Sequence, residues 1–288
     1  MFPTLNPDIK LGLVQLNVSN LARSLQFYQE VVGLQVLQTS ASRADLTIDG
    51  SHPFLRLEEI PNARVTPRRS AAGLYHFAIL LPTRRDLGLS LRNLIQSGIH
   101  IGQADHLVSE ALYITDPDNN GIEIYCDRPR DTWRRDTAGN YIMASDPIDW
   151  DGLLSEAEGT EWHGLPPGTT MGHIHFHIKN LAASKQFYCD ILGFDIVSDA
   201  RATMQALFIS AGGYHHHIGL NVWAGEDAPT PPSNGTGLAY YTIVFPHAQA
   251  LEEAVERLHH AGVQTNPQDQ GYDVTDPSDI HLKLIVAR

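Results

Sequence analysis

The 288-residue sequence has little cysteine, a deficit of positive charge and no long hydrophobic run at its start. Its two cysteines, Cys126 and Cys189, are too few for a disulfide framework or a cysteine-based zinc site, and they are typical of a reducing compartment. Lys and Arg total 20 against 33 Asp and Glu, a formal net charge of −13, which disfavours binding to nucleic acid. Residues 1–10 lack an apolar stretch, so we expect neither a signal peptide nor a membrane span. The sequence therefore predicts a cytoplasmic protein without a nucleic-acid or membrane partner.

Histidine, in contrast, is abundant. There are 15 histidines against 20 Lys plus Arg, within an otherwise ordinary globular composition of 42% hydrophobic and 18% charged residues. At roughly 150 residues per domain, the length suggests about two domains. Because histidine titrates near neutrality and is the commonest metal ligand, the positions of the histidines guide the prediction of function.

The chain contains an internal duplication. Gly12–Gly33 aligns without a gap to Gly172–Gly193, with nine identities in 22 positions. A weaker repeat relates Gly73–Gly98 to Gly237–Gly262. Four modules follow, at about residues 11–60, 73–127, 171–225 and 237–286.

Each of the two clearest repeats predicts an alternating strand followed by an amphipathic helix. Asn20 and Asn180 stand where an N-cap side chain accepts hydrogen bonds from free helical N–H groups. Gly33, and Gly193 in the second copy, suit the left-handed residue that ends a helix. Several short strands complete each module, which predicts an α+β architecture with mixed sheets.

A long connector separates the second module from the third. Residues 128–170 are rich in Pro, Gly and Asp, and they hold three of the four tryptophans. These large apolar rings indicate that the connector packs against the rest of the molecule. We therefore expect an N-terminal domain at residues 1–127, the connector at 128–170 and a C-terminal domain at 171–288.

A βαβββ module repeated in pairs resembles the vicinal oxygen chelate superfamily, which includes glyoxalases, fosfomycin-resistance proteins and extradiol dioxygenases. The resemblance covers nearly the whole chain. It implies four modules that form two open cups of mixed sheet. In that family a cup surrounds one metal, with ligands from the first strand of each module and from the last strand of one module.

The family pattern also implies candidate ligands. Three residues after the glycine of each first strand stand Gln15, His76, His175 and Tyr240. Seven residues after the aspartate of the two Asp-Pro turns stand Glu123 and Lys283. A charged lysine cannot coordinate a metal, so the implied ligands are His76, His175 and Glu123. Two histidines and a carboxylate form the facial triad of non-haem Fe(II) oxygenases, and Mn(II) suits the same ligands.

This ligand set has a topological consequence. His76 belongs to the second module and His175 to the third. They can bind one metal only if the second module pairs with the third, which leaves the first module to pair with the fourth. We therefore predict an exchanged pairing in which the two middle modules form the metal cup.

The stretch from His106 to Glu123 (HLVSEALYITDPDNNGIE) is similar to the signature of extradiol dioxygenases. It departs from that signature at Ala104, just before the stretch, and at Asn119. Asn tolerates left-handed backbone angles almost as glycine does, so we expect the turn at Asn119 to be preserved. The resemblance implies that His106 and Tyr113 hydrogen-bond the substrate oxygens.

A run of three histidines supplies the remaining part of the resemblance. The string YHHHIGLN, residues 214–221, is similar to a His-His pair of extradiol enzymes whose second member is the acid–base residue. That match implies His217, with His216 as the alternative because a slip of one residue exchanges their faces. His215 alone is equally compatible with a loop. His173 and His177 share the strand face of His175, and we expect them to be its neighbours and not ligands.

The implied reaction is the cleavage of catechol, or of a substituted catechol, by O2 next to the diol, giving a 2-hydroxymuconic-semialdehyde-type product. Such an enzyme is an oxidoreductase of aromatic catabolism whose partners are the catechol and O2, and the sequence is compatible with a homo-oligomer. Two alternatives remain open. One is a glyoxalase-like metal-dependent isomerase or lyase, and the other is a non-catalytic cup that binds a small molecule, as in bleomycin-resistance proteins.

Overall fold

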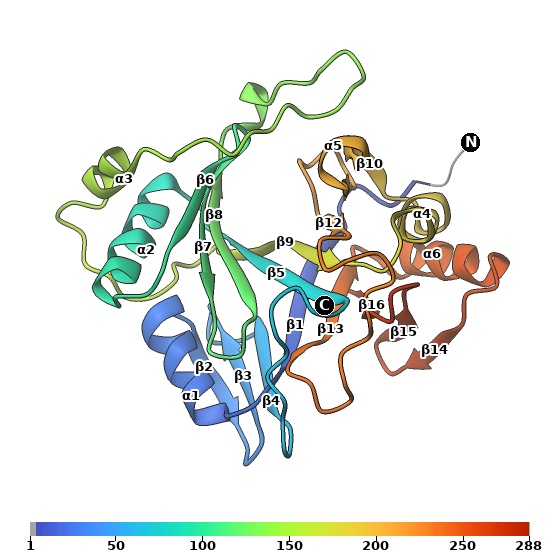
Figure 1. The fold of residues 1–288 in the computed structure, drawn as a ribbon, viewed down its shortest axis with the longest axis horizontal. Coiled ribbons are helices and arrows are strands. Elements are labelled where there is room, and N and C mark those ends of the chain that lie inside the picture. The colour runs from blue at the N-terminus through green and yellow to red at the C-terminus, as the bar shows by residue number, and fades with distance from the viewer. Residues whose placement is uncertain (1–3, 288) are drawn as a thin grey trace.

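Two eight-stranded sheets form the framework of the computed structural model, which describes residues 4–287 (Figure 1). In spatial order, the first sheet contains β14 (Thr265–Gln268), β15 (Gly271–Thr275), β16 (His281–Val286), β13 (Gly237–Phe245), β1 (Lys10–Val18), β4 (Leu55–Glu59), β3 (Arg43–Thr47) and β2 (Gln35–Thr39). The second contains β10 (Asp195–Ala200), β11 (Ala206–Ser210), β12 (Ile218–Asn221), β9 (Thr170–His177), β5 (Gly73–Leu80), β8 (Gly121–Asp127), β7 (Ser109–Thr115) and β6 (Gly102–Asp105). The α+β fold class predicted from the sequence is confirmed.

The modules pair in the exchanged order. Strand β5 of the second module lies antiparallel to β9 of the third at the centre of Figure 1, and His76 and His175 are Cα partners across that pair. Strand β1 of the first module lies antiparallel to β13 of the fourth. The predicted pairing of module two with module three is therefore confirmed. Both sheets contain strands from residues 1–127 and from residues 171–288. The division into an N-terminal and a C-terminal domain therefore remains a proposal that rests on the sequence repeat.

The duplicated helices begin and end at the predicted residues. The Asn20 side chain accepts a hydrogen bond from the backbone N–H of Arg23, and Asn180 caps the second copy in the same way. The helices end at Gly33 with φ 93° and at Gly193 with φ 103°. Both are π-helical in their second half, which the sequence did not reveal. The two copies are α1 (Leu21–Gln26) with η1 (Phe27–Val32), and α4 (Leu181–Lys185) with η3 (Gln186–Leu192).

Buried tyrosines of these helices connect the two sheets. The Tyr28 hydroxyl donates to Oδ2 of Asp116, which lies in the turn between β7 and β8, at 2.9 Å. The Tyr188 hydroxyl donates to Oδ2 of Asp276 in the corresponding turn of the fourth module, at 3.0 Å. Strand pairing thus joins the first module to the fourth, whereas these hydrogen bonds join the first module to the second and the third to the fourth.

The connector packs against the protein, as its tryptophans predicted. Helix α3 (Trp150–Glu156) lies on α2 (Arg84–Gln96), where a Cβ on Gly88 would come within 2.1 Å of the Leu153 carbonyl oxygen. Trp133 packs edge-to-face against Tyr141. The connector also contains η2 (Arg130–Thr132), and the remaining helices are α5 (Arg201–Met204) and α6 (Ala248–His260). The connector is therefore a fixed part of the structure.

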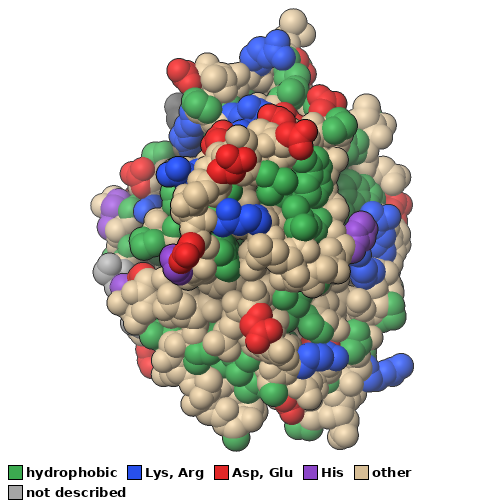
Figure 2. Space-filling model, turned by 90° about the vertical axis from the view of Figure 1, so that its left-hand side faces the viewer, with side chains coloured by type: hydrophobic (Ala, Val, Ile, Leu, Met, Phe, Trp, Pro, Cys, Tyr) green, Lys and Arg blue, Asp and Glu red, His purple; other side chains and the backbone are tan. Residues whose placement is uncertain are grey.

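One face of the molecule carries mixed charge. The face on the left of Figure 1, where α1, α2 and α3 lie, shows acidic, basic and apolar side chains interspersed (Figure 2). Within residues 4–287, no helix has the length and apolar character needed to cross a membrane. The first three residues of the N-terminal segment considered above lie outside the described residues.

Candidate metal centre

Three buried side chains converge on one point in the second sheet. Nε2 of His76 on β5 and Nε2 of His173 on β9 lie 3.1 and 3.0 Å from Oε2 of Glu123 on β8. The two Nε2 atoms are 3.3 Å apart. The three residues are between 1% and 6% exposed, so solvent does not compete for their lone pairs. Among residues 4–287, these are the side chains that satisfy the geometry of a three-ligand metal site.

The strand order explains this convergence. Strand β5 lies between β9 and β8, antiparallel to the first and parallel to the second, so ligands from three neighbouring strands reach one face. Gly172 precedes His173 because a Cβ there would lie 1.8 Å from the hydroxyl oxygen of Tyr125. Packing against β8 therefore requires a glycine next to His173.

The protonation states of the group suit metal coordination. Burial lowers the pKa of His173 to about 4 against the opposing effect of Glu123, so the imidazole is neutral at pH 7. Burial alone would raise the pKa of Glu123, but His173 and His76 hold that pKa well below its usual value. A carboxylate facing neutral imidazole nitrogen is the form in which these side chains bind metals.

The spacing of the three atoms also fits a metal ion. Ligands at about 2.1–2.2 Å from an ion in octahedral geometry are about 3.0 Å apart along each edge of one face. The observed separations of 3.0, 3.1 and 3.3 Å are close to that value. One face of three protein ligands would leave three positions free for other molecules. The donor set and its spacing therefore fit a divalent ion such as Fe(II) or Mn(II).

The geometry favours His173 over His175 as the third ligand, which differs from the sequence prediction. His175 lies beside the group, with its ring centroid 5.2 Å from that of His76. Its Nε2, however, accepts a hydrogen bond from the Asn221 amide at 2.9 Å, and Asn221 in turn is hydrogen-bonded to Nδ1 of His177 at 2.7 Å. The lone pair that would coordinate a metal is therefore already in use.

His106 and Tyr113 are brought together as the resemblance implied. Nδ1 of His106 lies 2.6 Å from the Ala144 carbonyl oxygen, and it must carry the proton because that oxygen can only accept. In the neutral ring, Nε2 then accepts the hydrogen bond from the Tyr113 hydroxyl at 2.6 Å. Burial and the nearby Glu123 carboxylate raise the pKa of Tyr113 well above its usual value. Tyr113 is therefore a neutral phenol of fixed orientation.

The structure places His216, and not His217, at the cavity. The His216 ring lies 4.1 Å from the His173 ring, centroid to centroid, and lines the same cavity. His217 does not line that cavity; its Nδ1 accepts from the backbone N–H of Ala211 at 3.2 Å. Burial lowers the pKa of His217 to about 3, so it remains neutral in this structural role. The geometry thus favours His216, the alternative given by the sequence analysis, over His217 as the acid–base residue.

His215 connects His216 to a carboxylate. Nδ1 of His215 lies 2.8 Å from Nδ1 of His216, and Nε2 of His215 lies 2.9 Å from Oδ1 of Asp127. Because a carboxylate can only accept, Nε2 of His215 carries a proton. In a neutral His215 ring, Nδ1 therefore accepts from His216, which leaves Nε2 of His216 unprotonated. The sequence did not predict this chain of hydrogen bonds, because no motif marks Asp127 as a partner of His215.

A cavity of about 810 Å³ opens onto the metal group. It is lined by His76, Glu123, His173, His106, Tyr113 and His216. The connector covers part of it, because Asp105 on β6 and Asp146 exchange backbone hydrogen bonds of 2.7 and 3.0 Å. A small molecule bound there would contact the metal group and the neighbouring acid–base side chains together.

Comparison with known proteins gives consistent matches. The model of the Glyoxalase/Bleomycin resistance protein/Dioxygenase superfamily matches residues 10–124 and 170–282. A catechol-2,3-dioxygenase of Bacillus subtilis strain 168 is 52% identical over 284 residues, which cover 98% of this chain and 99% of the relative.

Two solved structures show the same fold at low sequence identity. A candidate dioxygenase from Bacillus subtilis strain 168 has a TM-score of 0.65 at 10% identity, covering 99% of this chain and 86% of the other. Glyoxalase I from Zea mays has a TM-score of 0.56 at 16% identity, covering 97% and 92%. Because proteins that carry different functional names share this fold, the reaction must be inferred from the residues of the site.

Proposed function

Because the chain belongs to the Glyoxalase/Bleomycin resistance protein/Dioxygenase superfamily, we propose that it cleaves the ring of catechol or a substituted catechol with O2, next to the diol. The observation that carries the proposal is the cavity in which His76, His173 and Glu123 converge beside His106, Tyr113 and His216. The similarity to a catechol-2,3-dioxygenase over nearly the full length supports it.

We assign the metal ligands to His76, His173 and Glu123, which hold an ion by two neutral nitrogens and one negative oxygen. When bound there, Fe(II), or Mn(II) in its place, would hold both oxygens of the diol and couple oxidation of the ring to reduction of O2. The overall reaction adds both atoms of O2 to the catechol and breaks one ring C–C bond, so it needs no further reductant.

The surrounding side chains hold and move protons. Nε2 of His216, unprotonated through its bond to His215, can accept a proton from a diol hydroxyl and return it later. The Tyr113 hydroxyl donates its hydrogen bond to Nε2 of His106, so its oxygen lone pairs remain free to accept a hydrogen bond from the second hydroxyl in the cavity. The connector limits the access of water to this group.

The test is a direct assay of the protein purified without oxygen and loaded with Fe(II). Adding catechol and O2 should give the yellow ring-cleavage product with one O2 consumed per catechol. Glu123→Gln should lose at least about 1,000-fold in kcat/KM, because a neutral amide is a poor metal ligand. Glu253→Gln, on the exposed face of α6, is the matched control and should retain activity. Catechol loss without oxygen uptake would contradict the proposal.

Two broader expectations also remain proposals. Both cysteines are buried and unpaired, which supports a reducing, cytoplasmic location. Association into a homo-oligomer remains a prediction that sedimentation of the purified protein would check.

A further inference from the structure

We propose, resting on the function above, that this enzyme selects catechols whose ring substituents are uncharged and apolar, and that it discriminates against carboxylated catechols by charge. The cavity is larger than a single catechol ring requires. Its volume of about 810 Å³ is in the range that holds drug-sized ligands. What lines the space beyond the metal group therefore decides which substituents are accepted.

The cavity wall beyond the metal group carries no cationic side chain. Among the described residues, no Lys or Arg lines it. Polar side chains are interspersed in the wall, but a large part of it is formed by the apolar side chains of Val108, Ile142, Met143, Met204, Phe208 and Trp223. A carboxylate on the ring would lose its water here without gaining a cationic partner, which is costly.

This apolar part of the wall begins directly beside the metal group. The rings of Phe208 and Trp223 lie 5.6 and 5.3 Å from the ring of His175, which itself lies 5.2 Å from His76. The Trp223 indole N–H is occupied by the Met204 carbonyl oxygen at 2.7 Å, so the indole offers no free donor to an anion. A substituent that extends from a bound ring toward these residues contacts aromatic and thioether surface.

The guanidinium groups around the cavity are paired or line neighbouring cavities. Arg201 follows the lining residue Ala200 in the chain and donates to both carboxylate oxygens of Asp199, at 2.8 and 2.6 Å. Arg68 lines a separate cavity of about 380 Å³ and donates to Oγ1 of Thr115 at 3.3 Å.

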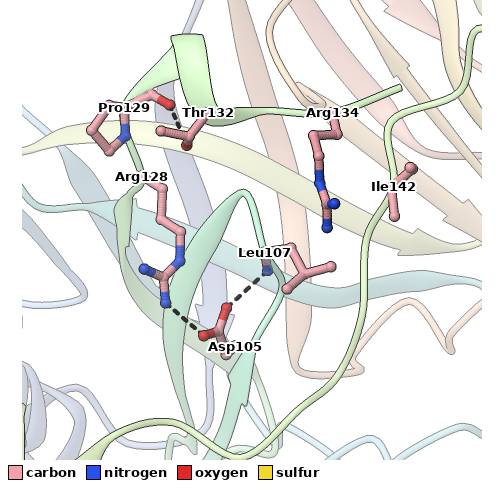
Figure 3. Close-up of a pocket in the computed structure, with 7 residues that line it drawn as sticks. All are labelled: Asp105, Leu107, Arg128, Pro129, Thr132, Arg134 and Ile142. Atoms are coloured by element: carbon pink, nitrogen blue, oxygen red, sulfur yellow. Dashed lines mark hydrogen bonds and ion pairs between the residues drawn. The ribbon is translucent and has the colours of Figure 1, made fainter. Parts of the chain in front are cut away.

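Arg128 and Arg134 line a further cavity of about 370 Å³, in which Arg128 is turned toward Asp105 (Figure 3). Ile142 lines both cavities, so a ring substituent would have to displace it to reach Arg134.

The acidic side chains of the wall strengthen the discrimination. Besides Glu123, whose charge a bound metal ion would offset, Asp136 and Asp199 line the cavity, and Asp199 has an arginine partner. Both aspartates are exposed, so solvent screens their repulsion, and the loss of carboxylate hydration contributes the larger share of the discrimination. The discrimination should therefore exceed an order of magnitude.

A matched pair of substrates isolates charge from ring electronics. 3,4-Dihydroxybenzoate and its methyl ester carry similar electron-withdrawing groups, but only the acid is anionic at pH 7. With the Fe(II)-loaded enzyme, kcat/KM for the ester should exceed that for the acid by at least about tenfold. Anaerobic calorimetry should show the same ranking in affinity, independently of turnover. Equal values for acid and ester, with catechol still cleaved, would overturn this inference alone. No cleavage of catechol, ester or acid would overturn the proposed function.

A substitution at the rim provides a second test. Met204 is 49% exposed, so an arginine there can extend into the cavity mouth without disturbing the core. Met204→Arg should raise the ratio of kcat/KM for the acid over the ester by at least tenfold. Met204→Leu keeps an apolar side chain and should leave that ratio unchanged. A ratio that is the same in both variants would show that charge at the rim does not control selection.

Discussion

At the scale of single residues, the composition of the proposed metal centre depends on which of two histidines on β9 is the third ligand. His173 reaches Glu123, whereas His175 is held by Asn221. His173→Ala should weaken Fe(II) binding by at least about 100-fold, since it removes a ligand, and His175→Gln should weaken it by less than about tenfold. Anaerobic competition with a chromophoric chelator measures both affinities. The opposite ranking would restore His175 as the ligand.

Asp127 is a positioning residue that acts on the cavity through His215 and His216. Asp127→Asn replaces a group that can only accept with a neutral amide that can also donate, so the proton is no longer fixed on Nε2 of His215 and His216 can present its N–H instead of its lone pair. We expect kcat to fall by about 10–100-fold with little change in KM. Asp127→Glu should restore part of kcat, and Asp131→Asn nearby should have no effect. A change confined to KM would assign Asp127 to binding.

By the ligand assignment proposed above, the sequence pointed to the same strands but to a position two residues further along β9. Counting forward from glycine selected His76 and His175. Both His76 and His173, however, lie seven residues before the residue that caps the next helix, Thr83 or Asn180. The helix cap fixes the end of the strand, whereas Gly172 stands where the Tyr125 side chain of β8 needs room and Gly73 has a left-handed φ of 133°, so the cap was the better reference. In the same way, the cavity is lined by His216 and not by His217, a shift of one residue from the first choice.

At the scale of elements, Gly88 on α2 explains how the connector is held. The helix would gain about 1 kcal/mol from alanine there by propensity, but the Cβ would lie 2.1 Å from the Leu153 carbonyl oxygen. We expect Gly88→Ala to destabilise the protein by about 1–2 kcal/mol net, because overpacking outweighs propensity. Chemical denaturation measures the change.

The fourth module offers the control for this substitution. The weaker repeat aligns Gly88 with Glu252 of α6, whose side chain is exposed. Glu252→Ala should change the stability by no more than about 0.5 kcal/mol. If Gly88→Ala stabilised the protein, α3 would have to move away from α2 at little energetic cost. That result would contradict tight packing of the connector.

The elements themselves were largely readable from the sequence. Asn20 and Gly33 predicted the limits of the first helix, and the repeat carried them to its second copy. The π-helical second halves were not predicted, because i to i+5 hydrogen bonding has no residue pattern of its own. Helix α3 was also missed, although Asp149 caps it in the ordinary way; the surrounding Pro- and Gly-rich sequence concealed so short a helix.

At the scale of the whole molecule, a buried carboxyl group makes stability depend on pH. Burial raises the pKa of Asp276 from 3.8 to about 6. The unfolded chain therefore releases this proton at a lower pH than the folded protein, and stability present below pH 4 is lost as the pH rises through 6. A shift of about two units corresponds to about 3 kcal/mol.

Asp276→Asn should remove this dependence. The amide keeps an acceptor for the backbone N–H groups of Ser278 and Ile280, and it cannot ionise. Unfolding measured between pH 4 and 7 should show a flatter profile for the variant than for the parent protein. Asp279→Asn, at an exposed position in the same turn, should keep the steep profile of the parent. Parallel profiles for Asp276→Asn and the parent would place the pH dependence elsewhere.

The exchanged pairing was predictable because only the two middle modules carry histidines at the family's ligand positions. The prediction does not depend on which histidine is the third ligand, since His173 and His175 lie on the same strand, β9. The equivalent place in the first sheet is occupied differently: the Tyr240 ring lies 4.5 Å from Nζ of Lys283, and its hydroxyl accepts from Arg56 at 3.3 Å.

The exchange also sets an order for folding during synthesis. The second sheet uses only residues between Gly73 and Asn221, so the metal cup can close before the last module leaves the ribosome. Strand β1 pairs with β13 more than 200 residues later, as between Gln15 and Tyr240, and contacts over such separations form slowly. The N-terminal strand, made first, therefore reaches its final partner last.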